Sequence, residues 1–119
     1  MILKIATQFA KACGGRKRTD GSCSAEEFYE DCFKPIFKMS LDKDEDLTVD
    51  LDGTAGYASS FLDESFGRLT LDLDFTVDEI NKRLHLISTE EPELIDEIRT
   101  SIREWFAEGA HPNSALSKK

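Results

Sequence analysis

The sequence predicts an α/β fold in which a mixed or largely parallel sheet of about four strands is covered by helices. Three stretches, at positions 2–9, 47–51 and 83–88, alternate apolar and polar residues with the two-residue period of a half-buried strand. Between and after them, apolar residues recur at three- and four-residue spacing, the period of a helix packed along one face. Alternating strands and helices favour parallel strands joined by right-handed crossovers.

After the first strand, expected over Ile2–Phe9, the first helix begins with a cap at Ser24. Ser24 and Glu27 have the spacing of a capping box. The apolar stripe of this helix consists of Phe28, Cys32, Phe33, Ile36 and Phe37. Pro35 lies within the stripe and lacks a backbone N–H. We therefore expect the helix to kink near Asp31, or to end before Pro35 and restart.

The second strand, Leu47–Leu51, leads into a glycine-containing turn. Gly53 and Gly56 stand where a positive φ or a close backbone approach costs little. Functional groups of parallel sheets gather beyond the carboxyl ends of the strands, so we expect the functional surface at Gly53–Ser60.

A helix is expected to begin at a pair of adjacent serines, Ser59 and Ser60. Serine is a common N-cap, and the predicted helix begins at Ser60. The three- and four-residue spacing of one helix face is kept by Phe61, Leu62, Ser65, Phe66 and Leu69. Asp63 and Glu64 are expected in the first turn, where negative charge suits the helix dipole.

A short helix follows, with its own capping box at Thr76 and Glu79 and an expected end at Asn81. The segment before it, Leu71–Phe75, alternates as a strand would, but we predict the end of a helix and then a loop.

The last helix is predicted to begin at Pro92, because proline suits the first turn of a helix, and to stop at Gly109. Its apolar stripe consists of Leu94, Ile95, Ile98, Ile102, Trp105 and Phe106. Trp105 and Phe66 are expected to be core or near-core anchors.

Length and charge limit the function classes. The 119 residues predict one domain over positions 2–109, with a flexible tail at 110–119. A net charge of -9 argues against nucleic-acid binding, and no apolar run has the length of a membrane helix, so we expect a cytoplasmic protein. Cys13, Cys23 and Cys32 have neither disulfide nor metal-site spacing, and no metal or cofactor is predicted.

One dense basic cluster stands out in this acidic chain, in the Gly14–Arg18 loop. It is either a solvated hairpin loop or an anion-binding loop. In the second case Gly15, Arg16 and Arg18 would bind a phosphate or a carboxylate.

Two sequence motifs resemble a known family. GTAGYASSFLDESFG at positions 53–67 and SAEEFYED at positions 24–31 are similar to the STAS-like family of unknown function, related to STAS domains of anti-sigma-factor antagonists. The resemblance covers roughly Ile2 to Phe106. It implies the same α/β fold, and a family commonly encoded with or fused to ATP-binding, kinase-like proteins.

The resemblance also implies a phosphoacceptor. In STAS antagonists a kinase-like ATPase phosphorylates a hydroxyl of an Asp-Ser-Ser-Gly motif, and the partner is released. By position Ser60 matches the acceptor and Ser59 the serine before it, whereas Ala58 and Phe61 replace the aspartate and the glycine. The other reading of the serines, as helix caps alone, stays open at this point.

Two function classes follow. The first is a non-enzymatic regulatory module for protein–protein interaction in signal transduction, whose partner is a kinase-like ATPase or another regulatory protein. The residues expected to contact the partner are Gly53, Gly56, Tyr57, Phe61, Asp63 and Glu64. The alternative is a domain that binds a small ligand or nucleotide through the Gly14–Arg18 loop and the Gly53–Ser60 turn.

Overall fold

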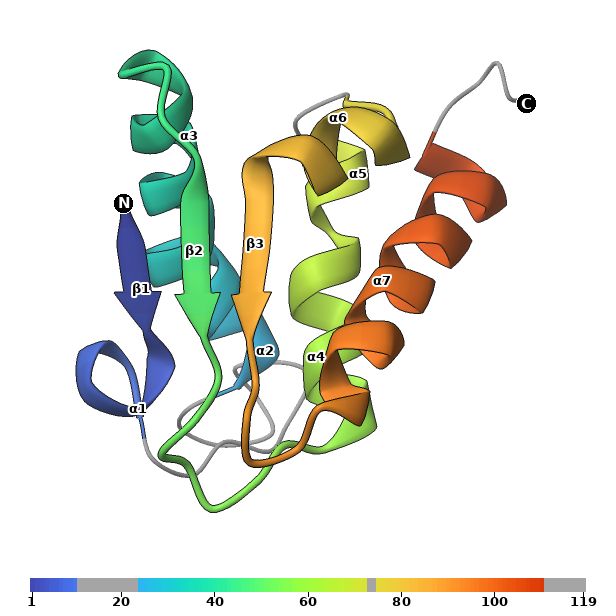
Figure 1. Cartoon of the computed structure of the whole chain (residues 1–119). Helices are drawn as coiled ribbons and strands as arrows, with labels where there is room; N and C mark the ends of the chain where they lie inside the picture. The colour runs from blue at the N-terminus through green and yellow to red at the C-terminus, as the bar shows by residue number, and fades with distance from the viewer. Residues whose placement is uncertain (11–23, 73–74, 111–119) are drawn as a thin grey trace.

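A three-stranded parallel sheet forms the centre of the fold. The computed structural model describes residues 1–10, 24–72 and 75–110. Within these ranges β1 (Ile2–Lys4), β2 (Leu47–Asp50) and β3 (Leu84–Ile87) lie in the order β1-β2-β3 (Figure 1). The parallel sheet is confirmed, but the described residues contain three strands rather than about four.

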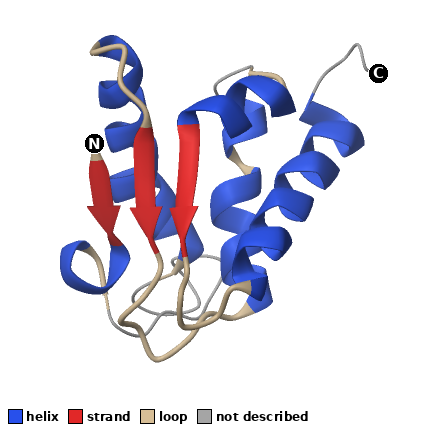
Figure 2. Cartoon of the chain, viewed as in Figure 1, coloured by secondary structure: helices blue, strands red, loops and turns tan. Residues whose placement is uncertain are grey.

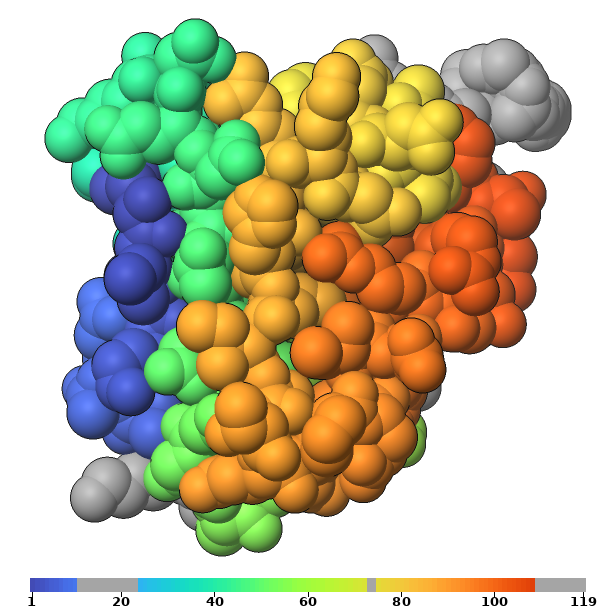
Figure 3. Space-filling model, in the orientation of Figure 1, coloured from blue at the N-terminus to red at the C-terminus, as the bar shows by residue number. Residues whose placement is uncertain are grey.

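Helical segments follow each strand. They are α1 (Ile5–Gln8), α2 (Ala25–Phe28), the π-helical η2 (Tyr29–Phe33), α3 (Lys34–Asp42), α4 (Ser59–Gly67), α5 (Leu69–Asp72), α6 (Val77–Arg83), α7 (Glu93–Trp105) and the π-helical η3 (Phe106–Ala110). The longer helices lie behind and beside the sheet, so β1, β2 and β3 remain visible from the front (Figures 2 and 3).

The two faces of the sheet differ in burial. Leu3, Val49 and Leu84 are buried towards the helices. On the opposite face Ile2 and Ile87 are exposed, as are Lys4 and His85. The alternation that predicted half-buried strands therefore reflects a sheet with helices on one side.

The first strand is shorter than its predicted range of 2–9. It ends at Lys4, and α1 follows, because Ile5 and Ala6 are both buried and two adjacent inward side chains do not fit an alternating strand. The Gln8 side chain accepts from Lys4 N–H at 2.7 Å, and the Thr7 hydroxyl donates to Lys4 C=O at 3.4 Å.

The other outer strand has a similar contact. Arg99 Nη2 donates to the carbonyl of Leu84, the first residue of β3, at 2.8 Å. Side chains thus occupy backbone groups of both outer strands that an added strand would need, which limits extension of the sheet.

The helix after Ser24 does not end and restart before Pro35, because α2, η2 and α3 follow one another without a gap from Ala25 to Asp42. The Ser24 hydroxyl accepts from Glu27 N–H at 3.1 Å, which confirms the cap. The irregularity expected near Asp31 is the π-helical segment Tyr29–Phe33, after which Pro35 is the second residue of α3. Proline has no N–H for a regular helical hydrogen bond, and the π-helical turn just before it is where the regular α-helical pattern is already interrupted.

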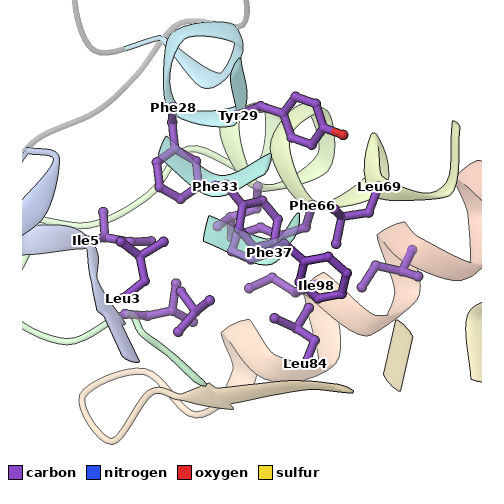
Figure 4. Close-up of a cluster of buried hydrophobic side chains, with 14 of the residues drawn as sticks. Leu3, Ile5, Phe28, Tyr29, Phe33, Phe37, Phe66, Leu69, Leu84 and Ile98 are labelled. Carbon is purple, nitrogen blue, oxygen red and sulfur yellow. The ribbon is translucent and has the colours of Figure 1, made fainter. Parts of the chain in front are cut away.

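Aromatic rings dominate the core between the sheet and the helices (Figure 4). Phe33 lies 4.8 Å from Phe66 and 5.6 Å from Phe28, measured between ring centroids. Phe66 is fully buried, as expected of a core anchor, whereas Trp105 is half-buried. Trp105 packs so closely on Gly67 that a Cβ at that glycine would collide with its ring.

The second half of the chain follows its local signals, with one exception. The capping box of Thr76 and Glu79 is confirmed, although α6 runs to Arg83 rather than Asn81. Leu71 and Asp72 end helix α5, and positions 73–74 lie outside the described residues. The stop predicted at Gly109 is wrong, because η3 continues to Ala110; glycine permits a helix to end but does not require it. The predicted tail lies mainly at 111–119, which the structure does not describe.

Candidate functional site

The candidate site lies at the carboxyl ends of the strands, where the loop after β2 meets the loop after β3 (Figure 1). Asp50, the last residue of β2, organises the start of the first loop. Its Oδ1 accepts from Asp52 N–H at 3.0 Å, and its Oδ2 pairs with Lys4 Nζ at 3.1 Å. The loop is therefore tied back to the neighbouring strand β1.

Asp52 joins the two loops. Its Oδ2 accepts from the Thr89 N–H at 3.1 Å and from the Thr89 hydroxyl at 2.5 Å, while its Oδ1 accepts from Glu90 N–H at 3.0 Å. The bonds from Glu90 and Thr89 stabilise the carboxylate and lower the pKa of Asp52. Near neutral pH Asp52 is therefore ionised, and both of its carboxylate oxygens accept hydrogen bonds.

Both glycines of the turn have the positive φ for which glycine was expected there. Gly53 has φ +92° and Gly56 has φ +130°, values that favour glycine. A Cβ on Gly53 would lie 3.3 Å from the Cβ of Ala6, so this position also allows a close approach to α1. The Gly53 N–H donates to Glu90 Oε1 at 2.9 Å.

Tyr57 and Phe61 lie together between the turn and the core. The Tyr57 hydroxyl donates to the carbonyl of Leu51 at 2.8 Å, and its ring lies 6.0 Å from that of Phe61. Phe61 is fully buried and Tyr57 is half-buried. Of these two residues from the predicted partner surface, Tyr57 alone has a side chain that a partner could reach in this conformation.

The serine pair does not cap α4 as predicted. The N-cap is Ala58, with extended φ -72° and ψ 142°, and no side chain caps the helix. Ser59 and Ser60 are the first two helical residues; Ser59 is exposed and Ser60 half-buried. The Ala58 carbonyl accepts from Phe61 N–H at 3.0 Å, so the chain becomes helical earlier than the serines indicated.

The earlier start also moves the acidic pair out of the first turn, which contains no acidic residue. The dipole argument for Asp63 and Glu64 is therefore wrong. Asp63 is half-buried, whereas Glu64 is buried and forms an ion pair with Arg68 one turn later. Glu64 faces the protein interior rather than a partner.

Sequence reasoning missed the charged cluster around Arg68. The Arg68 guanidinium lies 5.8 Å from the centre of the Tyr29 ring, and the Tyr29 hydroxyl is 3.5 Å from the Arg68 carbonyl oxygen. Burial, with the nearby Asp72, raises the pKa of Tyr29. Tyr29 lies at the margin of the core with its hydroxyl directed away from the other labelled rings (Figure 4). The four-residue spacing of Glu64 and Arg68 is the signal that could have found the ion pair.

A second polar cluster and a small pocket lie at the opposite end of the sheet. His85 Nε2 is 2.8 Å from Asp46 Oδ2, and Arg83 pairs with Asp44 at 2.6 Å. The pocket has a volume of about 250 Å³ and is lined by Leu41, Phe75, Glu79, Lys82 and Arg83. It is smaller than the usual ligand pocket of about 300–1,000 Å³ and does not include the predicted loop.

Some predicted residues lie outside the described ranges. These are Gly15, Arg16 and Arg18 of the basic loop, together with Cys13 and Cys23. Within the ranges that are described, no three His, Cys, Asp or Glu side chains form a group that could hold a metal ion. In the same part of the chain no helix combines the length and the apolar character needed to cross a membrane.

Comparison with known proteins gives one family. The family model described as a STAS-like domain of unknown function matches residues 24–94, which contain β2, β3, helices α2 to α6 and the β2–α4 loop. No curated protein and no solved structure gives a significant match to the chain. Since the match covers more than half of the sequence, and two of the three parallel strands lie within it with the β2–α4 loop, the chain belongs to the family of STAS-like domains of unknown function.

Proposed function

We propose that the protein is a non-enzymatic regulatory module that binds a kinase-like ATPase and is phosphorylated by it on Ser60, with Ser59 as the neighbouring acceptor. The observation that supports this most directly is the position of both serines in the first turn of α4, where neither serves as a cap. Their hydroxyls are not committed to stabilising the helix.

The first turn of a helix suits a phosphate. A phosphoserine carries about two negative charges, which backbone N–H groups and the positive end of the helix dipole stabilise. In the transfer, the serine oxygen forms a bond to the γ-phosphorus of ATP, the bond to the β-phosphate oxygen breaks, ADP leaves, and the hydroxyl proton passes to a base of the kinase or to water. Asp63, one turn from either serine, opposes the new charge.

The surface around the serines suits close docking. Gly53, Ala55, Ala58 and Ser59 are exposed, and none has a side chain larger than that of serine. A partner backbone can approach such a surface closely, and a phosphate on Ser60 would fill the space and repel an acidic partner group. Phosphorylation is therefore expected to release the partner with little change in the fold.

The alternative, a nucleotide-binding domain, has less support. Asp50, Asp52 and Glu90 place three carboxylates at the loop that would meet the phosphates. Like charges there disfavour a phosphate-bearing ligand. The basic loop that could compensate lies outside the described residues.

The test uses protein purified from its native cells and three baits for affinity capture: the parent, Ser60→Ala and Ser60→Asp. We expect intact mass and peptide mapping to show phosphate on Ser60 or Ser59. An ATP-hydrolysing protein should be retained by the parent and by Ser60→Ala but not by Ser60→Asp. Equal retention by Ser60→Asp, with no phosphate on either serine, would refute the proposal. Saturable binding of ATP or ADP by the purified chain, measured by calorimetry, would favour the alternative.

A further inference from the structure

The loops after β2 and β3 are held together by reciprocal hydrogen bonds, in which a carboxylate of each loop accepts from the other loop. We call this arrangement the Asp52–Glu90 clasp. Asp52 accepts three hydrogen bonds from Thr89 and Glu90, and Glu90 accepts one from Gly53. Each loop thus supplies a carboxylate that binds a backbone N–H of the other. The clasp joins residues 37 and 38 positions apart in the sequence.

The clasp begins where the sheet ends. The last backbone bond between β2 and β3 runs from Leu51 N–H to the Ile87 carbonyl at 2.8 Å. From Asp52 onward the described hydrogen bonds between the two loops use side-chain carboxylates, so the loops continue in contact beyond the sheet (Figure 1).

We propose that the Asp52–Glu90 clasp is a positioning device that makes the two loops one structural unit and sets the geometry of the Gly53–Ser60 surface. Breaking the hydrogen bonds of one loop then also loosens the other loop, although no single hydrogen bond connects all of the clasp residues. The consequence for docking rests on the proposed function: the β3–α7 loop influences partner binding through the clasp. The clasp itself is a property of the free protein.

The two carboxylates are used differently, which gives the proposal a sharp test. Asp52 uses both oxygens, so Asp52→Asn would turn an NH₂ group towards a donor and break part of the clasp. Glu90 uses one oxygen for one donor, so Glu90→Gln keeps an acceptor for Gly53. Conservative replacement should therefore disrupt the clasp at Asp52 and spare it at Glu90.

The experiment measures solvent exchange of individual amides by NMR on the full chain without a partner. In Asp52→Asn we expect exchange about tenfold faster at Thr89 and Glu90, and also at Gly53, whose N–H donates to Glu90 and not to the Asp52 carboxylate. Glu90→Gln should match the parent, and Asp46→Asn, at the other end of the sheet, is the matched control. The Val49 amide of β2 reports whether the sheet stays folded.

Acceleration confined to Thr89 and Glu90 would overturn the proposal, because the loops would then move separately. Equal effects of Asp52→Asn and Glu90→Gln would also overturn it. If Asp52→Asn does not fold, Thr89→Val serves instead, since it removes only the hydroxyl bond; unchanged Gly53 exchange in that variant counts against the clasp. A negative result here leaves phosphorylation of Ser60 untouched, and an absent phosphate leaves the clasp untouched.

Discussion

Replacing Glu64 with glutamine removes one charge of a largely buried ion pair. The Glu64 side chain is 6% exposed and that of Arg68 is 21% exposed. Arg68 Nε is buried and has no hydrogen-bond partner among the described residues, so Glu64 is the main group that compensates this guanidinium. Breaking a buried pair from one side typically costs about 3–5 kcal/mol.

Partial exposure of Arg68 and its contact with the Tyr29 ring reduce that figure. We expect Glu64→Gln to lower the free energy of unfolding by about 2–3 kcal/mol. Urea titration with an unchanged slope would measure the loss, and Glu104→Gln, at an exposed carboxylate in the last turn of α7, should change the stability by less than about 0.5 kcal/mol.

Replacing both members of the pair provides the second test. In a Glu64→Leu, Arg68→Leu double variant neither member of the pair is left without the other, so its cost should fall below the sum of the two single variants. Additive costs, or a Glu64→Gln variant within about 0.5 kcal/mol of the parent, would refute the reasoning that Glu64 compensates a buried guanidinium.

Three further predictions concern the core and the loops. Phe66→Ala should cost about 3–5 kcal/mol in a urea titration, because its ring is fully buried; a loss below about 1 kcal/mol would show that the site collapses or is exposed. Gly67→Ala should cost about 1–3 kcal/mol and change the fluorescence of Trp105, since a methyl group there collides with the indole; unchanged emission would contradict this packing. The lowered pKa of Asp52 means that its contribution to stability is present above the ordinary aspartate pKa and is lost as pH falls through the folded value. An NMR titration of Asp52, which faces Lys4, Asp50 and Glu90, should give a midpoint below that of a free aspartate, and a normal midpoint would contradict the bonding described.

Local signals predicted the elements well where a few neighbouring residues decide the structure. The caps at Ser24 and Thr76 depend on residues three positions away, and both are confirmed. The start of α4 was missed because Ala58 takes the N-cap position without a capping side chain, so no residue type marks it.

Contacts between distant residues could not be predicted from one sequence. Nothing local at Asp52 indicates that it binds Thr89, and nothing at Gly53 indicates that it donates to Glu90. The burial of Glu64 likewise depends on how α4 is turned against the rest of the fold, which its spacing to Arg68 alone does not decide.

The π-helical segment Tyr29–Phe33 keeps the phenylalanine side chains on one face of the first long helix. Phe28 and Phe33 are five residues apart, and in an α-helix that spacing turns a side chain about 140° away from its starting face. The wider π-turn brings the two rings back together, stacked at 10°. Phe37, four residues further along α3, then stays on the same face.

This segment therefore contains one residue more than a regular helix would need. Deleting Glu30, which is exposed, would leave a four-residue spacing that an ordinary α-turn accommodates with both phenylalanines still facing the core. Deleting Glu97 from α7 would instead rotate Ile98 and Ile102 relative to Leu94. Thermal unfolding should show a much smaller loss for the first deletion than for the second, and equal losses would mean that the extra residue has a role beyond helical phase. The segment is thus a position where the length of this chain can change by one residue while the aromatic core keeps its arrangement.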